Sequence, residues 1–232
     1  ASAVDANVFD DMLRREDLLD RLKDQPEFKA RLAQRFAAHI SATFAPSRIE
    51  GIVDSLGALI TPELARHKAK WPGSIDAAQQ ARDLQEIKDY TTRRSTEIHT
   101  EISSELEIGR VVDLTLATTG QGTVYLAGVP VSSGSIPIFP NLDAKLTAVS
   151  APGYQFDSWT GINGPSTTTL NTSGAIAITA NFIPAPGTVT GGTLAANSTF
   201  TAAGSPYTIM DDLIVPAGVT LNVEAGVTLQ LA

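Results

Sequence analysis

Two kinds of hydrophobic pattern divide the chain. Up to about residue 108, apolar residues recur every three or four positions, the spacing that gathers side chains on one face of an α-helix. Further on, short runs rich in Val, Thr and Ile are separated by glycines, a pattern typical of β-strands and tight turns. The pattern predicts an α+β multidomain fold, with a helical N-terminal domain followed by β-rich domains.

The helical part is predicted to be a set of antiparallel helices. A first helix is expected near residues 8–23, and another begins near Pro26. The stretch Ser47–Glu50 has the form of a capping box, in which a Ser oxygen and a Glu carboxylate bind free amides at a helix start. Thr61-Pro62-Glu63 predicts the start of a further short helix, which Trp71-Pro72-Gly73 ends, and Ser74 is expected to cap a long last helix. The expected buried stripes are Phe28, Leu32, Phe36, Ile40 and Phe44, then Ile49, Ile52, Val53, Leu56 and Ile60, then Ile75, Ala78, Leu84, Ile87, Thr91, Ile98, Ile102 and Leu106.

The β-rich part divides again. Strands are predicted at Val111–Ala117, Thr123–Leu126, Lys145–Ser150 and Ala175–Phe182. The predicted domains are thus 1–108, helical; 109–183, β-rich; 184–190, a linker; and 191–232, the start of a right-handed parallel β-helix. That last domain rests on a repeat, in which Ala217–Leu221 recurs as Ala225–Leu229.

The β-helix is expected to be incomplete. Coils of about 20 residues would allow roughly two of them in 191–232, and the apolar pattern continues through Leu229–Ala232. A solenoid needs a polar cap on its last coil. We therefore expect the chain to be a fragment of a longer protein, or its last coil to be covered by another molecule.

Composition narrows the function. The chain has 232 residues, a formal net charge of −8 and no cysteine. The lack of cysteine excludes a disulfide framework, a zinc–thiolate site and a thiol nucleophile. The acidic balance disfavours nucleic acid or an anionic membrane as partner. Residues 1–108 hold 34 of the 42 charged residues, so the two parts differ chemically as separate domains do.

The sequence offers no catalytic, cofactor-binding or metal-binding constellation. The histidines, His39, His67 and His99, lack the spacing of metal ligands. Gly120-Gln121-Gly122 lacks the rest of a phosphate-binding motif, so it is interpreted as a turn. The pairs Asp10-Asp11 and Asp211-Asp212 point their side chains apart in either a helix or a strand. We predict no catalytic residue, no metal site, and no cofactor in this chain.

Aromatic residues give one weak binding hypothesis. Tyr154 and Phe156 share a face if their segment is extended, and Trp159 follows. Exposed aromatic rows stack on sugar rings, whereas buried rows fill a core, which is the commoner role and the one favoured for Phe156 and Trp159. Tyr154 and Trp159 are retained as possible glycan contacts.

Residues 27–108 resemble the C-terminal helical tail of the spore-coat CotH kinase family. The resemblance rests on Pro26–Leu32, Arg35–Ile40, Thr43–Arg48, Ile52–Leu56 and Thr61–His67, which follow one another in the family's order and spacing. It implies a secreted atypical protein kinase whose ATP- and metal-binding residues lie upstream of this tail. No catalytic residue is therefore carried over, and ATP with Mg²⁺ or Mn²⁺ is expected only if that upstream region is present.

Two further resemblances point to the bacterial cell surface. Residues 115–183 resemble a divergent internalin-type B-repeat, chiefly through Gly153–Gly161, which has the pattern Gly-Tyr-x-Phe-x-x-Trp-x-Gly, and through Ala180-Asn181-Phe182. Residues 197–232 are similar to the opening of a parallel β-helix. Together they imply an extracellular or cell-surface location in a bacterium.

Three functional hypotheses follow. The first is a non-catalytic scaffold fragment of a secreted or surface protein, C-terminal to a kinase-like core. The second is an accessory part of an atypical protein kinase, in which the upstream region transfers phosphate. The third is carbohydrate or cell-wall binding by the β-region. The expected partners are the upstream kinase-like region, downstream β-helix coils, and a cell-surface glycan or protein, with no nucleic acid and no membrane span.

Overall fold

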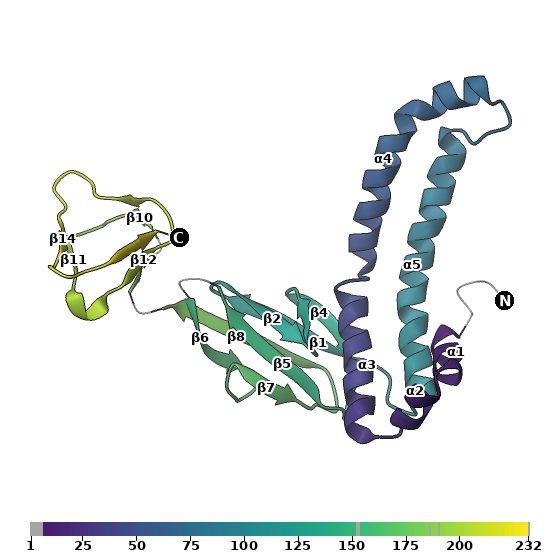
Figure 1. Cartoon of the computed structure of the whole chain (residues 1–232), viewed down its shortest axis with the longest axis horizontal. Helices are drawn as coiled ribbons and strands as arrows, with labels where there is room; N and C mark the ends of the chain where they lie inside the picture. Colours follow the sequence, from purple (N-terminus) through teal and green to yellow (C-terminus); the bar gives the residue numbers. More distant parts are fainter. Residues whose placement is uncertain (1–6, 152–153, 186, 190, 232) are drawn as a thin grey trace.

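The computed structural model describes residues 7–151, 154–185, 187–189 and 191–231. Three parts follow one another: a group of helices, a two-sheet β-sandwich, and a small unit of short parallel strands at the C-terminal end (Figure 1). The α+β class predicted from the sequence is therefore confirmed.

The first part contains five helices among the described residues: α1 (Val8–Arg15), α2 (Asp17–Leu22), α3 (Pro26–Ser41), α4 (Pro46–Lys70) and α5 (Ala77–Glu105). The single helix expected near residues 8–23 is in fact two. The backbone of Glu16, at φ −118° and ψ 89°, leaves the helical conformation and separates them.

The predicted helix ends need three corrections. Ser47 is not the N-cap, because α4 begins one residue earlier, with Pro46 in its first turn and Ala45 as the N-cap residue. Pro62 does not restart a helix but lies within α4, which bends toward its C-terminal end (Figure 1). Asp76, not Ser74, caps α5: its carboxylate accepts from the amide of Gln79 at 2.9 Å, which lowers the pKa of Asp76. Trp71 does end α4, as predicted.

Helices α4 and α5 form an antiparallel hairpin that projects beyond the other helices (Figure 1), and we call it the arm. Asp54 pairs with Lys88 at 2.5 Å, and Thr61 donates to Gln80 at 2.8 Å, which sets the register of the two helices. Only Val53, Gly57 and Leu64 of α4 are buried. The predicted stripe is correct in its spacing but wrong in its burial, because Ile52, Leu56 and Ile60 remain exposed.

The β-sandwich consists of two four-stranded sheets with one common core. The first has the order β4-β1-β8-β6 and pairs β1 with β8 in parallel; the second has the order β3-β2-β5-β7 and is antiparallel throughout. The strands are β1 (Val112–Thr119), β2 (Gly122–Leu126), β3 (Val129–Val131), β4 (Gly134–Ile138), β5 (Ala144–Ser150), β6 (Tyr154–Thr160), β7 (Thr167–Leu170) and β8 (Ile176–Pro184). The four predicted strands are confirmed as β1, β2, β5 and β8 to within two residues, whereas β3, β4, β6 and β7 were not predicted.

Helix α3 belongs to two hydrophobic cores at once. Ala38 packs into the sandwich core beside strands β3 and β4, while Ala33, Ala37 and Ile40 pack into the helical core. Small alanine side chains let the helix approach both neighbours closely. The larger residues of the predicted stripe, such as Phe28, are only partly buried, and Phe44 is exposed. The helices and the sandwich are consequently packed as one unit.

In the described residues of the C-terminal unit, the strands are short and pair in parallel. They are β9 (Thr188–Val189), β10 (Gly192–Thr193), β11 (Ser198–Phe200), β12 (Tyr207–Ile209), β13 (Leu213–Ile214), β14 (Leu221–Val223) and β15 (Leu229–Leu231), with the 3₁₀-helix η1 (Ala202–Gly204) between β11 and β12. The pairs are β9 with β12, β10 with β13, β11 with β14, and β12 with β15, and paired residues are 20–23 positions apart in the sequence. The eight-residue repeat therefore marks successive strands β14 and β15, each preceded by a glycine at φ 86°, rather than successive coils.

The predicted linker at 184–190 also needs correction. Pro184 is still part of β8, and Thr188 and Val189 pair with β12. Pro186 and Thr190 lie outside the described residues, as does Gly153 of the B-repeat pattern.

Candidate functional site

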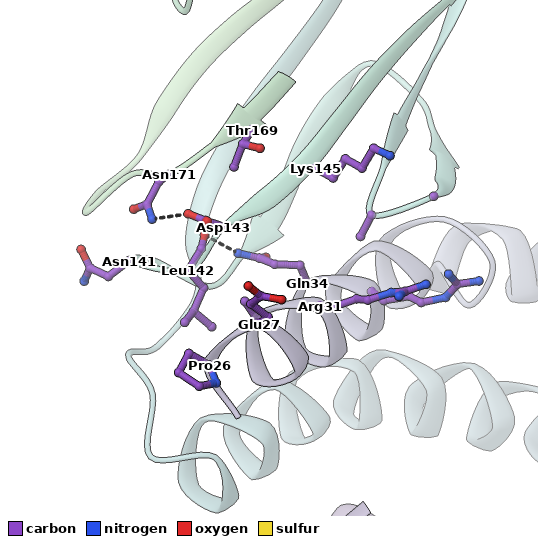
Figure 2. Close-up of a pocket in the computed structure, with 14 residues that line it drawn as sticks. Pro26, Glu27, Arg31, Gln34, Asn141, Leu142, Asp143, Lys145, Thr169 and Asn171 are labelled. Atoms are coloured by element: carbon purple, nitrogen blue, oxygen red, sulfur yellow. Dashed lines mark hydrogen bonds between the residues drawn. The ribbon is translucent and has the colours of Figure 1, made fainter. Parts of the chain in front are cut away.

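A cleft of about 650 Å³ lies between helix α3 and the β-sandwich (Figure 2), and we call it the junction cleft. Boundaries between packed units are common places for ligand sites. Its lining comes from α3, the β2–β3 turn, the loop between β4 and β5, and strands β5 and β7: Pro26, Glu27, Ala30, Arg31, Gln34, Arg35, Ala127, Gly128, Asn141, Leu142, Asp143, Lys145, Thr169 and Asn171.

Gln34 fixes one wall of the junction cleft. Its side chain is fully buried, and its Nε2 donates to the carbonyl oxygens of Phe139 at 2.8 Å and Leu142 at 3.2 Å. Its Oε1 accepts from the backbone N–H of Phe139 at 3.2 Å. The loop between β4 and β5 is therefore held against α3 by side-chain bonds to its backbone, as a neighbouring strand would hold it.

Positive φ angles shape the β side of the cleft. Ala127 (φ 49°) and Gly128 (φ 82°) are the central residues of the β2–β3 hairpin, the combination found in a type I′ turn. The N–H of Ala127 donates to the carbonyl of Lys145 at 2.8 Å. A Cβ placed on Gly128 would lie 3.6 Å from Nη1 of Arg35, so the guanidinium of Arg35 rests against this turn.

Cations and acceptors occupy different parts of the cleft. Figure 2 shows Arg31 and Lys145 on one side and Asp143, Asn141 and Asn171 on the other, with Arg31 extending away from Glu27. Asp143 accepts from Nδ2 of Asn171 at 2.7 Å. The cleft is thus polarised, and it can receive a negative group at one end and hydrogen-bond donors at the other.

A second surface feature lies on the arm. A groove with a volume of about 860 Å³ is lined mainly by apolar side chains of α3, α5, the start of α4 and the α3–α4 connection, among them Phe36, Phe44, Ile49, Tyr90 and Ile98. Residues three or four positions apart lie on the same face of a helix. On α4, Ile49 therefore shares a face with the exposed residues Ile52, Leu56 and Ile60. On α5, Tyr90 shares a face with the exposed Ile87. Since Ile49 and Tyr90 line the same groove, these stripes border one another, and we call them together the arm face.

The possible glycan contacts lie on β6. Trp159 is only 7% exposed, and its indole N–H donates to the carbonyl of Pro165 at 3.0 Å. Its ring packs against Phe156, whose centroid is 5.4 Å away. This agrees with the core role favoured for both residues. Tyr154 is half-buried at the edge of the same core. The glycan hypothesis for Tyr154 and Trp159 stays a prediction.

The histidines lie in different surroundings. His39 is half-buried, with Nδ1 3.0 Å from the hydroxyl of Thr43, and His67 is exposed near the end of α4. His99 is 8% exposed, and its Nε2 has no hydrogen-bond partner among the residues that the structure describes. Burial lowers the pKa of His99. Within the described ranges, no three His, Asp or Glu side chains are grouped to hold a metal ion.

The short basic pairs behave differently from one another. Arg14 pairs with Asp10 and Arg15 with Asp11, each four residues earlier on the same helix. Arg93 donates to the backbone carbonyl of Asp89, and Arg94 forms an ion pair with Glu101 through two hydrogen bonds. Both side chains of the Arg94–Glu101 pair are largely buried, and the pair has the two-bond geometry typical of strong Arg–carboxylate contacts.

Two comparisons with protein families bear on function. Residues 6–98 match the family described as CotH kinase protein, and residues 112–186 match the divergent InlB B-repeat domain. The first match starts earlier and ends earlier than the resemblance seen at 27–108. No curated protein and no solved structure shows significant similarity to the chain. The two families fit a surface-associated or spore-coat protein.

Sequence reasoning did not find the residues of the junction cleft. Arg31 and Arg35 are spaced as on one helix face, but Lys145 comes from β5 and Asn171 directly follows β7, both far from α3 in the sequence. Gln34 looks like an ordinary polar helix residue until its partners are known.

In the described part of the chain, no helix is long and apolar enough to cross a membrane.

Proposed function

We propose that this chain is a non-catalytic scaffold of a bacterial surface or spore-coat protein, and that its arm packs against a kinase-like unit. The observation that carries the proposal is the exposed apolar arm face, in a region that matches the CotH kinase family. Large apolar side chains gathered on one side of a helical hairpin are typical of contact surfaces between proteins. Because α3 packs into both hydrophobic cores, it would hold the arm in a fixed position relative to the β-sandwich.

Charge supports the same arrangement. The opposite side of the arm carries the Asp54–Lys88 ion pair, with Asp54 largely exposed, whereas the arm face is apolar. A helix with one apolar and one charged side buries the apolar side. The arm is therefore proposed to have a partner on one side and solvent on the other.

The test measures complex formation with a CotH-family kinase from which the corresponding helical region has been removed. The wild-type chain is expected to co-elute with it in size-exclusion chromatography, and the double variant Ile52→Asp/Leu56→Asp is not. Ala58→Asp on the same helix is the control, because Ala58 is exposed and outside the apolar stripe. Equal complex formation by the double variant, or none by the wild type, would contradict the proposal.

The C-terminal unit is proposed to be the first coils of a parallel β-helix that spaces or anchors the surface protein. Parallel pairing at a separation of 20–23 residues supports this, since each coil of a β-helix lies directly on the previous one. Exposed Leu229 and Leu231 on β15 would then contact a further coil.

A role in phosphoryl transfer is the second candidate, because the family matched by residues 6–98 is a kinase family. In this role the chain would stabilise a catalytic region that binds ATP and Mg²⁺ or Mn²⁺. Adding the chain in trans to a CotH-family kinase lacking its helical region should raise incorporation of labelled phosphate into protein substrates. An unchanged rate would count against this candidate.

A further inference from the structure

We propose that the junction cleft binds an acidic saccharide, with the carboxylate of the sugar at the Arg31–Lys145 end. The proposal does not depend on the contact between the arm and a kinase-like unit. It rests on three properties of the cleft: unpaired cations, a separate group of acceptors, and a wall fixed before any ligand arrives.

The first property concerns the cations that line the cleft. In the part of the chain that the structure describes, Arg31, Arg35 and Lys145 take part in no ion pair and no side-chain hydrogen bond. The protein as a whole has a net charge of −8, whereas the lining of this cleft has three cationic side chains and two acidic ones, Glu27 and Asp143. A carboxylate bound there would gain charge-assisted hydrogen bonds, which are about twice as strong as neutral ones.

The other end of the cleft suits sugar hydroxyls. Asp143, Glu27 and the side-chain oxygens of Asn141 and Asn171 are acceptors, and amide groups and Thr169 also donate. These acidic groups would repel an isolated anion such as phosphate if it occupied the whole cleft. A ligand with one carboxylate and several hydroxyls matches both ends, whereas a ligand of uniform negative charge matches only one.

The cleft is also preorganised. Gln34 holds the Phe139–Leu142 backbone, and the β2–β3 turn is fixed by its hydrogen bond to Lys145. Pro26 and Leu142 supply apolar surface for the carbon face of a sugar ring. A wall that need not become ordered on binding saves the entropy that a flexible loop would lose.

The experiment is calorimetric titration of the whole chain with tetragalacturonate, its fully methyl-esterified form and inorganic phosphate. Tetragalacturonate should bind, and its affinity should fall with added NaCl. The Arg31→Gln/Lys145→Gln variant should bind it about tenfold more weakly or worse, which corresponds to the loss of one good charge-assisted contact. Arg66→Gln removes the same kind of charge from the distant arm and should leave the affinity unchanged.

A spectroscopic readout keeps the test independent of any variant's stability. In the wild-type chain, tetragalacturonate should shift the backbone amide resonances of Ala127, Gly128 and Asn141 more than those of the arm. The proposal is overturned if no binding occurs at millimolar ligand, if the methyl ester binds equally well, or if phosphate binds as tightly as the saccharide. Shifts confined to other surfaces would overturn it as well.

Discussion

The side-chain amide of Gln34 pairs with both backbone polar groups of Phe139, donating to its carbonyl oxygen at 2.8 Å and accepting from its N–H at 3.2 Å. Phe139 follows strand β4 of the sandwich, yet its ring lies in the helical core with Ile102 and Leu106. One residue thus crosses from the β-sandwich into the helices, and one helical side chain satisfies its backbone. This contact links the two family-matched regions physically.

Replacing Gln34 with leucine should therefore destabilise the helices and the sandwich together. The variant leaves the buried N–H and C=O of Phe139 without partners, and each such group costs about 1–3 kcal/mol. We expect the free energy of unfolding to fall by about 2–4 kcal/mol in urea titration followed by circular dichroism. Gln85→Leu, at an exposed position on α5, is the control. A loss no larger than that of the control would show that the contact is dispensable.

The stability of the chain should depend on the protonation of His99. Burial lowers the pKa of His99 in the folded state below the ordinary 6.5. A hydrogen bond with the backbone of Ser95 raises the pKa, but it is the smaller of the two effects. Between the folded and unfolded pKa values the unfolded chain binds more protons, so the free energy of unfolding must decrease as the pH falls below 6.5. One proton contributes at most about 1.4 kcal/mol per pH unit.

The measurement is chemical denaturation between pH 8 and roughly pH 4 for the wild type and His99→Leu. The variant should lose this part of the acid-side slope while remaining folded at neutral pH, because leucine leaves no buried nitrogen unpaired. His67→Leu, which removes an exposed histidine from α4, serves as the control for the loss of a histidine side chain. Identical slopes in all three proteins would refute the role of His99.

Two glycines of α4 should respond oppositely to added bulk. A Cβ on Gly51 would meet nothing within 4 Å, so Gly51→Ala should stabilise the protein by up to about 1 kcal/mol through helix propensity. A Cβ on Gly57 would lie 2.6 Å from Cδ1 of Leu84, so Gly57→Leu should force α4 and α5 apart. Thermal unfolding compares the two variants. A Gly57→Leu variant as stable as the wild type would contradict the close contact between Gly57 and Leu84.

The glycan hypothesis for strand β6 requires two separate substitutions. Trp159→Ala should cost about 3–5 kcal/mol because it empties a buried site, so loss of binding in that variant would be ambiguous. Tyr154→Ala, at a half-buried position, should fold and is the informative variant. In a pull-down on cell-wall glycans, binding that survives Tyr154→Ala would eliminate Tyr154 as a contact.

Local patterns were sufficient for the elements but not for their surroundings. The three- and four-residue spacing located the long helices, and runs rich in β-branched residues between glycines located β1, β2, β5 and β8. The same spacing could not tell which face of α4 would be covered, because that depends on where α5 lies. Helix caps failed for a related reason: Ser74 and Asp76 are both suitable caps, and the path of the α4–α5 turn selects Asp76.

By itself, the sequence determined the division into a charged helical part and a glycine-rich β part, because hydrophobic period and turn residues are local properties of the chain. Only the tertiary structure decided that α3 serves two cores, that Phe139 enters the helical one, and that Arg31 and Lys145 border a single cleft. These relationships join residues about a hundred positions apart. They depend on how whole elements pack, which no periodicity along the chain records.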